Sequence, residues 1–267
     1  DKGLDIIELL SATDGGMVQA DIAKALGRSA NEIFRMLDRL VRRGYVQRNA
    51  DHYELTLKLF TLSHQHAPLR RLVSLANPVL RELSMNSQQS CQLAVYDRGH
   101  VVVVAQNESP TYYGLSIRLG SRIGLFNTGS GHVLMAFASD AEREFMMREH
   151  EPLPGEAQPD DLLLQLNRVR KLGHQKMDSM QIHGVVNLSA PVFGANGRAM
   201  AVLTMPFVRP VQSPYPDVNK CLQLVCKAAT EISNIIGGRD TGDLMRSSNK
   251  HQNANLHLSE RAREPVR

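Results

Sequence analysis

Arginine is concentrated in one short stretch of the 267-residue chain, and its chemistry suits the phosphates and guanines of DNA. Between residues 28 and 48, six arginines are accompanied by only two acidic residues, Glu32 and Asp38. A guanidinium group forks onto phosphate oxygens, or onto the acceptor pair of guanine, better than an amine can. A solvated helix face is the usual explanation of a charge run, but soluble surfaces mix both signs. DNA binding is therefore the better interpretation of this excess.

The sequence NTGSGHV, residues 127–133, raises the question of catalysis, with Ser130 as nucleophile and His132 as base. Thr128 stands where the G-x-S-x-G motif of hydrolases requires glycine. Two residues this close on one loop rarely reach each other, and no acidic residue is evidently placed to orient His132. We therefore expect that the protein is not an enzyme.

The same glycine-rich turn has the features of a binding site. Gly129 and Gly131 would let the backbone approach a ligand. The N-terminus of a following helix would offer free N–H groups to an anion. The alternative is that both glycines serve only a tight turn between a strand and a helix.

The spacing of cysteine and histidine indicates neither a metal site nor a disulfide framework. Cys91, Cys221 and Cys226 form no C-x-x-C pair, and we expect them to be buried thiols in a reducing cytosol. His64 and His66 come nearest to a metal-binding pair, but they have no obvious partners. The sequence contains no G-x-G-x-x-G motif and no P-loop, so we predict no cofactor.

The composition is that of a globular chain, with 42% hydrophobic and 22% charged residues. A formal charge of +4 permits a nucleic-acid partner without requiring one. No apolar run approaches the roughly 18 residues that cross a membrane. We expect a cytoplasmic protein with no membrane partner, built as one large domain or two smaller ones.

Three helices are expected to position the arginines. Apolar spacing in LDIIELL, residues 4–10, predicts a first helix, and VQADIAKALG, residues 18–27, predicts a second. Ser29 and Glu32 form an S-x-x-E capping box, which marks the start of a third helix only two residues later. Two helices joined by a short turn that contains glycine form a helix-turn-helix.

The third helix is strongly two-sided. On a helical wheel its apolar residues gather on one side, which must pack on the first two helices. Asn31, Arg35, Arg39 and Arg42 gather on the other side and face outward. The segments YVQR and YELT that follow predict a β-hairpin wing, with Arg48 near its tip.

The order of these elements resembles the winged helix-turn-helix of the IclR-type bacterial transcription regulators. The motifs ADIAKALG and SANEIFRMLDRLVRRGYV carry the resemblance in the first part of the chain. It continues through LTLKLFTL, LANPVLREL, CQLAVYDRGHVVVVAQNESP, IRLGSRIGLFNTGSGHVLMAF, LNRVRKLGH and LSAPVFGANGRAMAVL. It covers about residues 3–237, and the order and spacing of the motifs make it specific.

The second half of the chain predicts a mixed α/β (α+β) domain with an antiparallel sheet. Hairpins are expected at 91–107 and 185–208, a further strand at 112–119, and helices at 67–85, 131–138, 159–173 and 216–237. The resemblance implies that this domain is a GAF/PAS-like sensor of a small molecule. The predicted domains are a winged helix-turn-helix at 1–62, a linker helix at 63–86, an effector-binding sensor at 87–237 and a disordered tail at 238–267.

The resemblance also implies where an effector would bind. In the resembled family the glycine-rich turn lines the effector pocket, together with an acidic residue, a cysteine and two serines. Carried across, these positions fall on Gly129 and Ser130, on Met177 with Asp178 beside it, on Asn187, and on Thr204 and Pro206.

These departures predict a different kind of effector. Pro206 has neither an N–H nor a hydroxyl, and Met177 brings a flexible apolar side chain. With Leu115 and its neighbours in 112–117, they could wall a roomy and apolar cavity. We expect an aromatic or extended organic acid or amide rather than a two- or three-carbon acid. Asn187 could hydrogen-bond this ligand or be a satisfied core amide.

The residues expected at the DNA also depart from the family pattern, which has small hydroxyl residues early in the recognition helix. Asn31 could bond adenine and Glu32 could bond cytosine, although capping already explains Glu32. The candidate DNA-binding residues are Arg28, Ser29, Asn31, Glu32, Arg35, Arg39, Arg42 and Arg48.

The sequence therefore predicts a ligand-responsive, DNA-binding regulator of a catabolic operon. One winged helix contacts few bases, so we expect a symmetric dimer on palindromic double-stranded DNA. The resemblance implies dimers and often dimers of dimers, which are homotetramers. The alternative is a metabolite-binding sensor protein or sensor enzyme whose helix-turn-helix mediates protein contacts, and this would show no dependence on Arg35.

Overall fold

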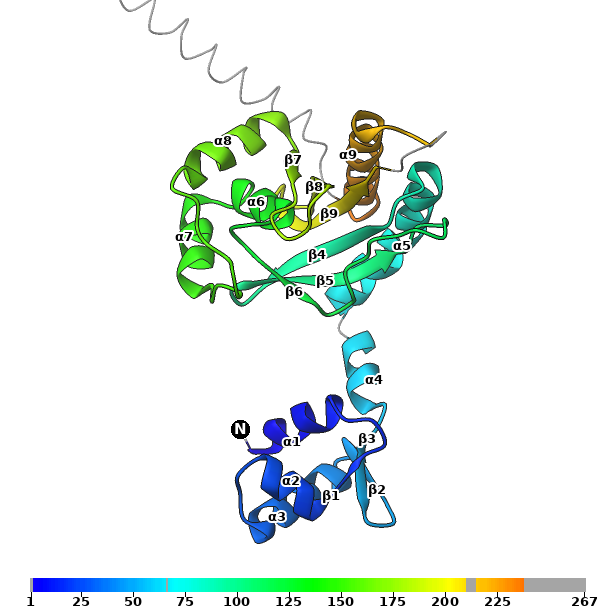
Figure 1. Ribbon diagram of the computed structural model, residues 1–267, viewed down its shortest axis with the longest axis vertical. Coiled ribbons are helices and arrows are strands. Elements are labelled where there is room, and N and C mark those ends of the chain that lie inside the picture. The colour runs from blue at the N-terminus through cyan, green and yellow to red at the C-terminus, as the bar shows by residue number, and fades with distance from the viewer. Residues whose placement is uncertain (1, 66, 210–214, 238–267) are drawn as a thin grey trace, which may run out of the picture. The chain divides into compact units, whose positions relative to one another are not determined.

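The computed structural model describes residues 2–65, 67–209 and 215–237, so the predicted tail at 238–267 lies outside the described residues. The chain divides into two compact units between Arg71 and Leu72 (Figure 1). The mixed α/β fold class, with a winged helix-turn-helix and an antiparallel-sheet domain, is confirmed. The functional domain ranges predicted above remain a proposal.

The first unit contains α1 (Lys2–Ser11), α2 (Gln19–Ala25), α3 (Ala30–Arg42), and a sheet of three strands in the order β1-β3-β2. The wing is formed by β2 (Val46–Asn49) and β3 (His52–Leu55), and β1 (Met17–Val18) adds a short edge that the sequence did not predict. Apolar residues from all three helices and from the wing share one core, which fixes the orientation of α3.

The boundaries of α3 follow from local capping. Ser29 is the N-cap, and its hydroxyl accepts the N–H of Glu32 at 3.3 Å. After α2 and after α3 the chain turns at Gly27 and Gly44, which have φ of 61° and 73°. In this left-handed region glycine avoids the strain of a Cβ, and the following N–H can reach back into the last helical turn.

Two further helices follow the wing. The linker was predicted as one helix at 63–86, whereas the structure has α4 (Lys58–Gln65) and α5 (Ala67–Ser87). The hydroxyl of Thr56 accepts the N–H of Lys58 at 3.1 Å, which helps to start α4 before the predicted boundary.

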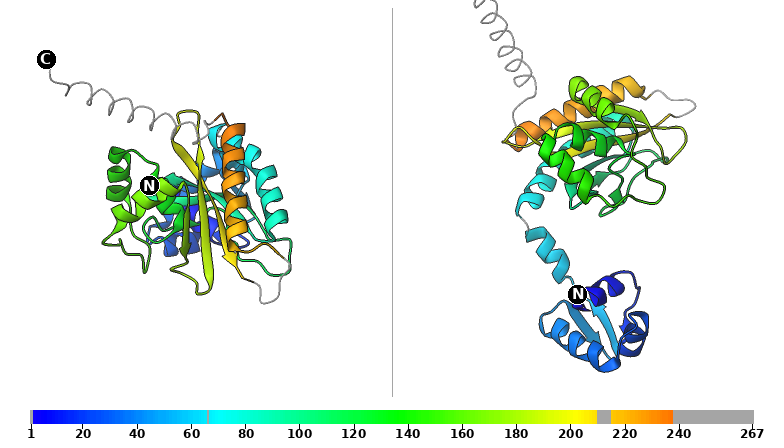
Figure 2. Two further views of the ribbon diagram at one scale, coloured as in Figure 1. Left: turned by 90° about the horizontal axis from the view of Figure 1, so that it is seen from above. Right: turned by 90° about the vertical axis from the view of Figure 1, so that its left-hand side faces the viewer.

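The second unit is built on one antiparallel sheet of the order β6-β5-β4-β9-β8-β7. Its strands are β4 (Cys91–Asp97), β5 (His100–Asn107), β6 (Arg122–Ile123), β7 (Gln175–Asp178), β8 (Val185–Phe193) and β9 (Ala199–Val208). One face is covered by α5 and α9 (Val218–Ile235), and the other by α6 (Gly129–Ala136), α7 (Asp140–Glu149) and α8 (Leu162–Leu172) (Figure 2).

Strand alternation divides the sheet residues between these two faces. Leu203, Met205 and Phe207 of β9 belong to the apolar core with α5 and α9. Thr204, between them in sequence, lies directly opposite Gln92 of β4 and Ser189 of β8, and hydroxyl contacts place it on the α6 side. The α6 side of the sheet therefore carries a row of polar residues.

The predicted strand at 112–119 is wrong. This segment is irregular, and only Arg122–Ile123 pairs with β5 at this edge of the sheet. Tyr112 and Tyr113 are 89% and 70% exposed, whereas Leu115 and Ile117 are half-buried and line the cavity described below. The sequence analysis also missed α7 and β7.

Candidate functional site

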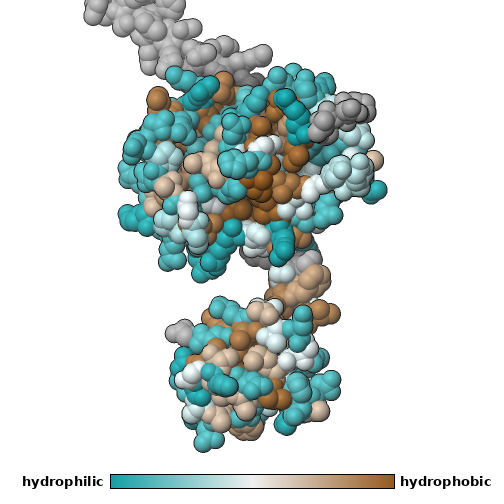
Figure 3. All heavy atoms as spheres, in the orientation of Figure 1, coloured by the Kyte–Doolittle hydropathy of each residue, from teal (hydrophilic) through white to brown (hydrophobic). Residues whose placement is uncertain are grey.

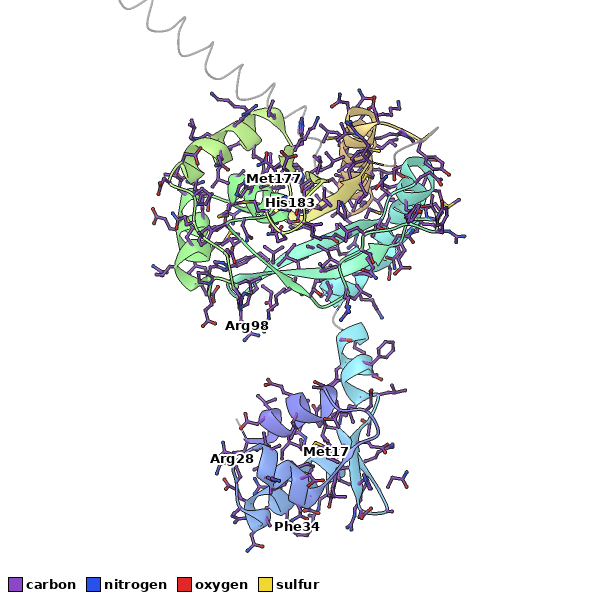
Figure 4. All side chains as sticks on the ribbon, in the orientation of Figure 1. Met17, Arg28, Phe34, Arg98, Met177 and His183 are labelled. Atoms are coloured by element: carbon purple, nitrogen blue, oxygen red, sulfur yellow. The ribbon has the colours of Figure 1, made fainter. Side chains whose placement is uncertain are left out.

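The outward face of α3 is the first candidate site. Asn31, Arg35 and Arg42 are exposed on it, as the helical wheel predicted. Phe34 lies beside them with 51% of its surface exposed, and Figure 4 marks it on the outer side of α3. Arg42 forms an exposed ion pair of 3.0 Å with Asp38 one turn earlier.

Three of the predicted DNA-binding residues contact other residues of the first unit. Arg28 contacts Asp5 of α1 at 3.3 Å and Glu32 at 3.7 Å. Lys2 also pairs with Glu32, and this hydrogen bond is the main reason that the pKa of Glu32 lies below its ordinary value. These pairs join α1 to the start of α3, and Ser29 is occupied as the N-cap.

The remaining arginines flank the outward face. Arg39 lies along a groove of about 410 Å³ between α1, α3 and α4, whose other lining residues are mostly apolar. Arg48 lies on the wing, where its Nε donates to the carbonyl of Ala50 at 2.9 Å and its guanidinium lies 5.7 Å from the ring centre of Tyr53. Arg39 is also exposed, so all four residues that the helical wheel placed on one side of α3 are exposed in the structure: Asn31, Arg35, Arg39 and Arg42.

The second candidate site is a cavity of about 220 Å³ beside the N-terminus of α6. Figure 3 shows apolar side chains gathered over this part of the second unit. Of the predicted effector residues, the cavity is lined by Leu115, Gly129, Ser130, Asn187, Thr204 and Pro206. The structure therefore brings six residues together that are separated by up to 91 positions in the sequence (206 − 115).

Met177 and Asp178 are not among the residues that line the cavity. Asp178 is exposed on β7, and Met177 lies opposite Asn187 with its sulfur 3.8 Å from Gln175 Nε2 (Figure 4). The wall at this side is formed instead by Ser179, Gln181 and Ile182, in the loop after β7.

Buried hydroxyls form the floor of the cavity. Ser130 Oγ lies 2.9 Å from Thr204 Oγ1, which donates to Ser189 Oγ at 2.8 Å. The same row of the sheet continues to Gln92 on one side and to Gln175 on the other. The sequence analysis missed Gln92, although a polar residue within the apolar strand CQLAVYD could have indicated it.

The glycines of the turn are required by close contacts. A Cβ on Gly131 would lie 2.0 Å from the carbonyl of Leu125, and one on Gly129 would lie 2.7 Å from Ser189 Oγ. Thr128 caps α6 by accepting the N–H of Gly131 at 3.0 Å. The N–H groups of Gly129 and Ser130 begin the helix, where no intrahelical acceptor is available to them.

His132 is a structural residue of α6. Its Nε2 lies 2.7 Å from the carbonyl of Phe126, and its Nδ1 lies 3.1 Å from Gln175 Nε2. Nε2 therefore carries the proton and Nδ1 accepts, and burial lowers the pKa of the imidazole. Since Ser130 bonds Thr204, the nucleophile and base considered above do not face each other.

A buried carboxylate holds the wall of the cavity that contains Leu153 and Pro154. Glu156 accepts the N–H of Phe126 at 2.7 Å and that of Leu153 at 2.9 Å. His150 Nε2 approaches the same carboxylate to 3.1 Å, and both side chains are fully buried. The two groups are within ion-pair distance, but their angles do not suit a hydrogen bond, so His150 Nε2 has no hydrogen-bond partner among the described residues.

The cysteines are buried or half-buried, and burial raises the pKa of Cys91 to about 12 and of Cys221 to about 11. Among the residues that the structure describes, no cluster of His, Cys, Asp and Glu could hold a metal ion. In the same part of the chain no helix has the length and apolar character to cross a bilayer. His66 lies outside the described residues.

These two sites define a DNA-binding protein with a separate small-molecule pocket. The family model of the IclR helix-turn-helix domain matches residues 1–50, and that of the C-terminal domain of the bacterial transcriptional regulator IclR matches residues 64–234. The chain belongs to the IclR family, and it is a transcriptional regulator with a DNA-binding domain and an effector-binding domain.

Relatives agree with this assignment. The HTH-type transcriptional regulator KdgR of Dickeya chrysanthemi is 25% identical over 82% of this chain and 74% of its own. The crystal structure of Pseudomonas aeruginosa HmgR is 26% identical, with a TM-score of 0.68 over 88% of this chain and 97% of its own. An IclR homologue from Microbacterium hydrocarbonoxydans, complexed with 4-hydroxybenzoate, shares the fold at 19% identity and a TM-score of 0.72, with the same coverage.

Proposed function

We propose that this regulator binds a palindromic operator as a dimer and controls a catabolic operon in response to an aromatic or extended organic acid or amide. The observation that carries the effector class is the size and lining of the cavity beside α6. The cavity measures about 220 Å³, whereas an engineered apolar cavity of about 150 Å³ holds benzene. One substituted ring would fill this space, and a two-carbon acid would leave most of it empty.

The lining supports the same class. Leu115, Ile117, Ile182 and Val185 present apolar surface to the ligand, and Pro206 offers it no hydrogen-bond donor. The homologue that was crystallised with 4-hydroxybenzoate has this fold and holds a ligand of this kind. Asn187 lines the cavity, which favours a ligand contact over the role of a core amide.

The DNA contacts are assigned by the exposure of the side chains. Asn31 is suited to adenine, Arg35 and Arg42 to guanine or phosphate, and Arg48 on the wing to phosphate. Phe34 is suited to the C5-methyl group of thymine, which is the apolar group of the major groove. Arg28, Ser29 and Glu32 would act indirectly, by holding the start of α3 in place.

A dimer is supported by the small reach of one recognition helix and by apolar surface on the first unit. Leu57, Phe60 and Leu62 are exposed on or just before α4, and Leu62 lines the groove that Arg39 borders. Burying such surface between two copies would place two α3 helices on one duplex. A dimer of dimers remains part of the proposal on the family resemblance alone.

Catalysis is not part of the proposed function. The nitrogens of His132 are engaged by Phe126 and Gln175, and burial disfavours the charged form that would follow proton uptake. Because the proposed target is an operator, we expect the protein to act in the cytoplasm.

The test is selection of bound DNA from a random duplex pool by the full chain, followed by ligand screening on the selected complex. We expect an enriched palindrome, and we expect 4-hydroxybenzoate or benzamide to change its affinity more than glyoxylate or pyruvate does. Failure to enrich any sequence, with binding that does not respond to salt, would favour a protein-interaction role for the helix-turn-helix. Stabilisation by glyoxylate and pyruvate alone would exclude the proposed effector class.

A further inference from the structure

The residues that line the cavity differ in charge and exposure from one end to the other. Arg122 of β6 is exposed, and it is the charged residue among the described lining residues. Gln92, Ser130 and Thr204, at the other end, are at most 3% exposed and carry no charge. The mouth of the cavity is therefore cationic and its inner end is polar but neutral.

We propose that the effector lies with its carboxylate at Arg122, at the mouth, and with a neutral polar group at the inner end beside α6. This inference rests on the proposed effector class and gives it an orientation. The ligand class is a ring-sized organic acid that carries a hydroxyl, keto or amide group remote from its carboxylate.

The guanidinium of Arg122 is available for a ligand. It makes no ion pair with any carboxylate that the structure describes. One of its terminal nitrogens lies 3.5 Å from Nε2 of His100. The nearby carboxylate of Glu156 is already occupied by Phe126, Leu153 and His150. About four of the five N–H donors of the guanidinium therefore remain for an anion.

The inner end has an unsatisfied polar atom that a neutral group would satisfy. Gln92 Oε1 is buried without a hydrogen-bond partner among the described residues, and Gln92 lines the cavity. The N–H groups of Gly129 and Ser130 lie at the same end, at the start of α6. This end presents acceptors and donors together, and a hydroxyl or an amide of the ligand can serve both.

A carboxylate at the inner end would be less favourable than one at Arg122. It would lose its hydration at a buried end and would meet the unpaired acceptor oxygen of Gln92. A helix N-terminus offers it the equivalent of about half a charge, whereas Arg122 offers a full charge at a site where part of the hydration is retained. The orientation with the carboxylate outward is therefore preferred.

The experiment compares an acid with its neutral isostere on the full chain. Dissociation constants of 4-hydroxybenzoate and 4-hydroxybenzamide are measured by calorimetry for the wild type, Arg122→Gln and Arg118→Gln. Arg118 is an exposed arginine of the same segment that does not line the cavity, so it controls for net charge. We expect Arg122→Gln to weaken binding of the acid about tenfold and binding of the amide less than about twofold. Arg118→Gln is expected to change neither dissociation constant.

The inner end is tested with the hydroxyl group as the variable. Gln92→Leu is expected to reduce the preference for 4-hydroxybenzoate over benzoate, because it removes an acceptor that the hydroxyl would use. Equal losses of acid and amide in Arg122→Gln, or no loss of either, would overturn the orientation while leaving the effector class intact. If the wild type bound none of these compounds but still selected its operator, the effector class itself would be wrong and the orientation with it.

Discussion

Phe34 is a large apolar side chain on the most polar helix of the first unit, and its position beside Asn31 and Arg35 gives it a specific expected role. Half of its surface is exposed, although burial of such a ring is favourable. In a major groove the available apolar partner is the thymine methyl group. At the scale of one residue, Phe34 is therefore expected to contribute a preference for thymine.

Replacing thymine by deoxyuridine in the selected operator tests this role, because it removes only the methyl group. Losing one buried methyl costs about 0.8 kcal/mol, so we expect about fourfold weaker binding at one position in each half-site. Phe34→Ala should bind both duplexes equally when affinities are measured by fluorescence anisotropy. Unequal binding of the two duplexes by Phe34→Ala would assign the methyl contact to another residue.

The arginines of α3 and of the wing differ in what they already contact, and this difference matters at the scale of the element. Arg35→Ala and Arg48→Ala should each reduce the slope of log affinity against log salt by about 0.9 if each residue neutralises one phosphate. Arg28→Ala is the matched control, because Arg28 is paired with Asp5 and Glu32. We expect it to lower the melting temperature and to leave the slope unchanged.

Arg35 and Arg48 should differ in their effect on sequence preference. Arg48→Ala is expected to weaken binding to all DNA sequences alike. Arg35→Ala should in addition relax the preference at one base pair if Arg35 reads a base. The measurement is titration of the selected operator and of single-base variants at several salt concentrations. A slope for Arg48→Ala that equals that of the wild type would contradict the phosphate contact.

The buried imidazole of α6 makes the stability of this element depend on pH. Burial lowers the pKa of His132 below its ordinary value of 6.5, so the unfolded chain binds the proton more readily than the folded one. The contribution of neutral His132 is complete above pH 6.5 and is lost as the pH falls from there toward the folded pKa. The limiting slope is about 1.4 kcal/mol per pH unit for one proton.

His132→Gln tests this dependence, since glutamine can still donate to the carbonyl of Phe126 but does not titrate. The free energy of unfolding is measured between pH 5 and pH 8 by urea denaturation of both proteins. We expect the variant to be less stable at pH 8 and to lose less stability on acidification. Parallel pH profiles for the two proteins would show that another group is responsible.

At the scale of the whole molecule, a dimer with one α3 per half-site fixes the geometry of the operator. The half-sites should lie about 10 base pairs apart, or a multiple of that spacing, so that both helices meet the same side of the duplex. Insertion of about five base pairs between them rotates one half-site by half a turn. We expect this insertion to weaken binding at least about tenfold in a mobility-shift assay, and undiminished affinity would indicate independent monomers.

The parts of the fold that the sequence predicted are those governed by local patterns. Two hairpins, at 91–107 and 185–208, were predicted from runs of apolar residues around turns, and the capping pair Ser29 and Glu32 located α3. The segment 112–119 was misjudged because half-buried Leu115 and Ile117 alternate with exposed neighbours as in a strand, although the segment forms no strand and lines the cavity. Propensity alone cannot distinguish these cases.

The candidate site was less predictable, because it depends on register between strands. Thr204 and Pro206 could be placed by the family resemblance, but the partnership of Thr204 with Gln92 across the sheet has no sequence signal. Arg122 was not singled out, since a single arginine before an apolar run is common. The carry-over reached Met177 and Asp178 on β7, whereas the residues that line the cavity on this side belong to the loop after β7.

The alternation of β9 has a consequence for how this protein can change over evolutionary time. Thr204 and Pro206 line the cavity, whereas Leu203, Met205 and Phe207 face the apolar core with α5 and α9. Substitution at 204 or 206 changes the chemistry of the pocket without opening a void in that core, so its cost to folding is limited. Specificity for new effectors can therefore be acquired at alternate positions of one strand while the intervening positions preserve the scaffold.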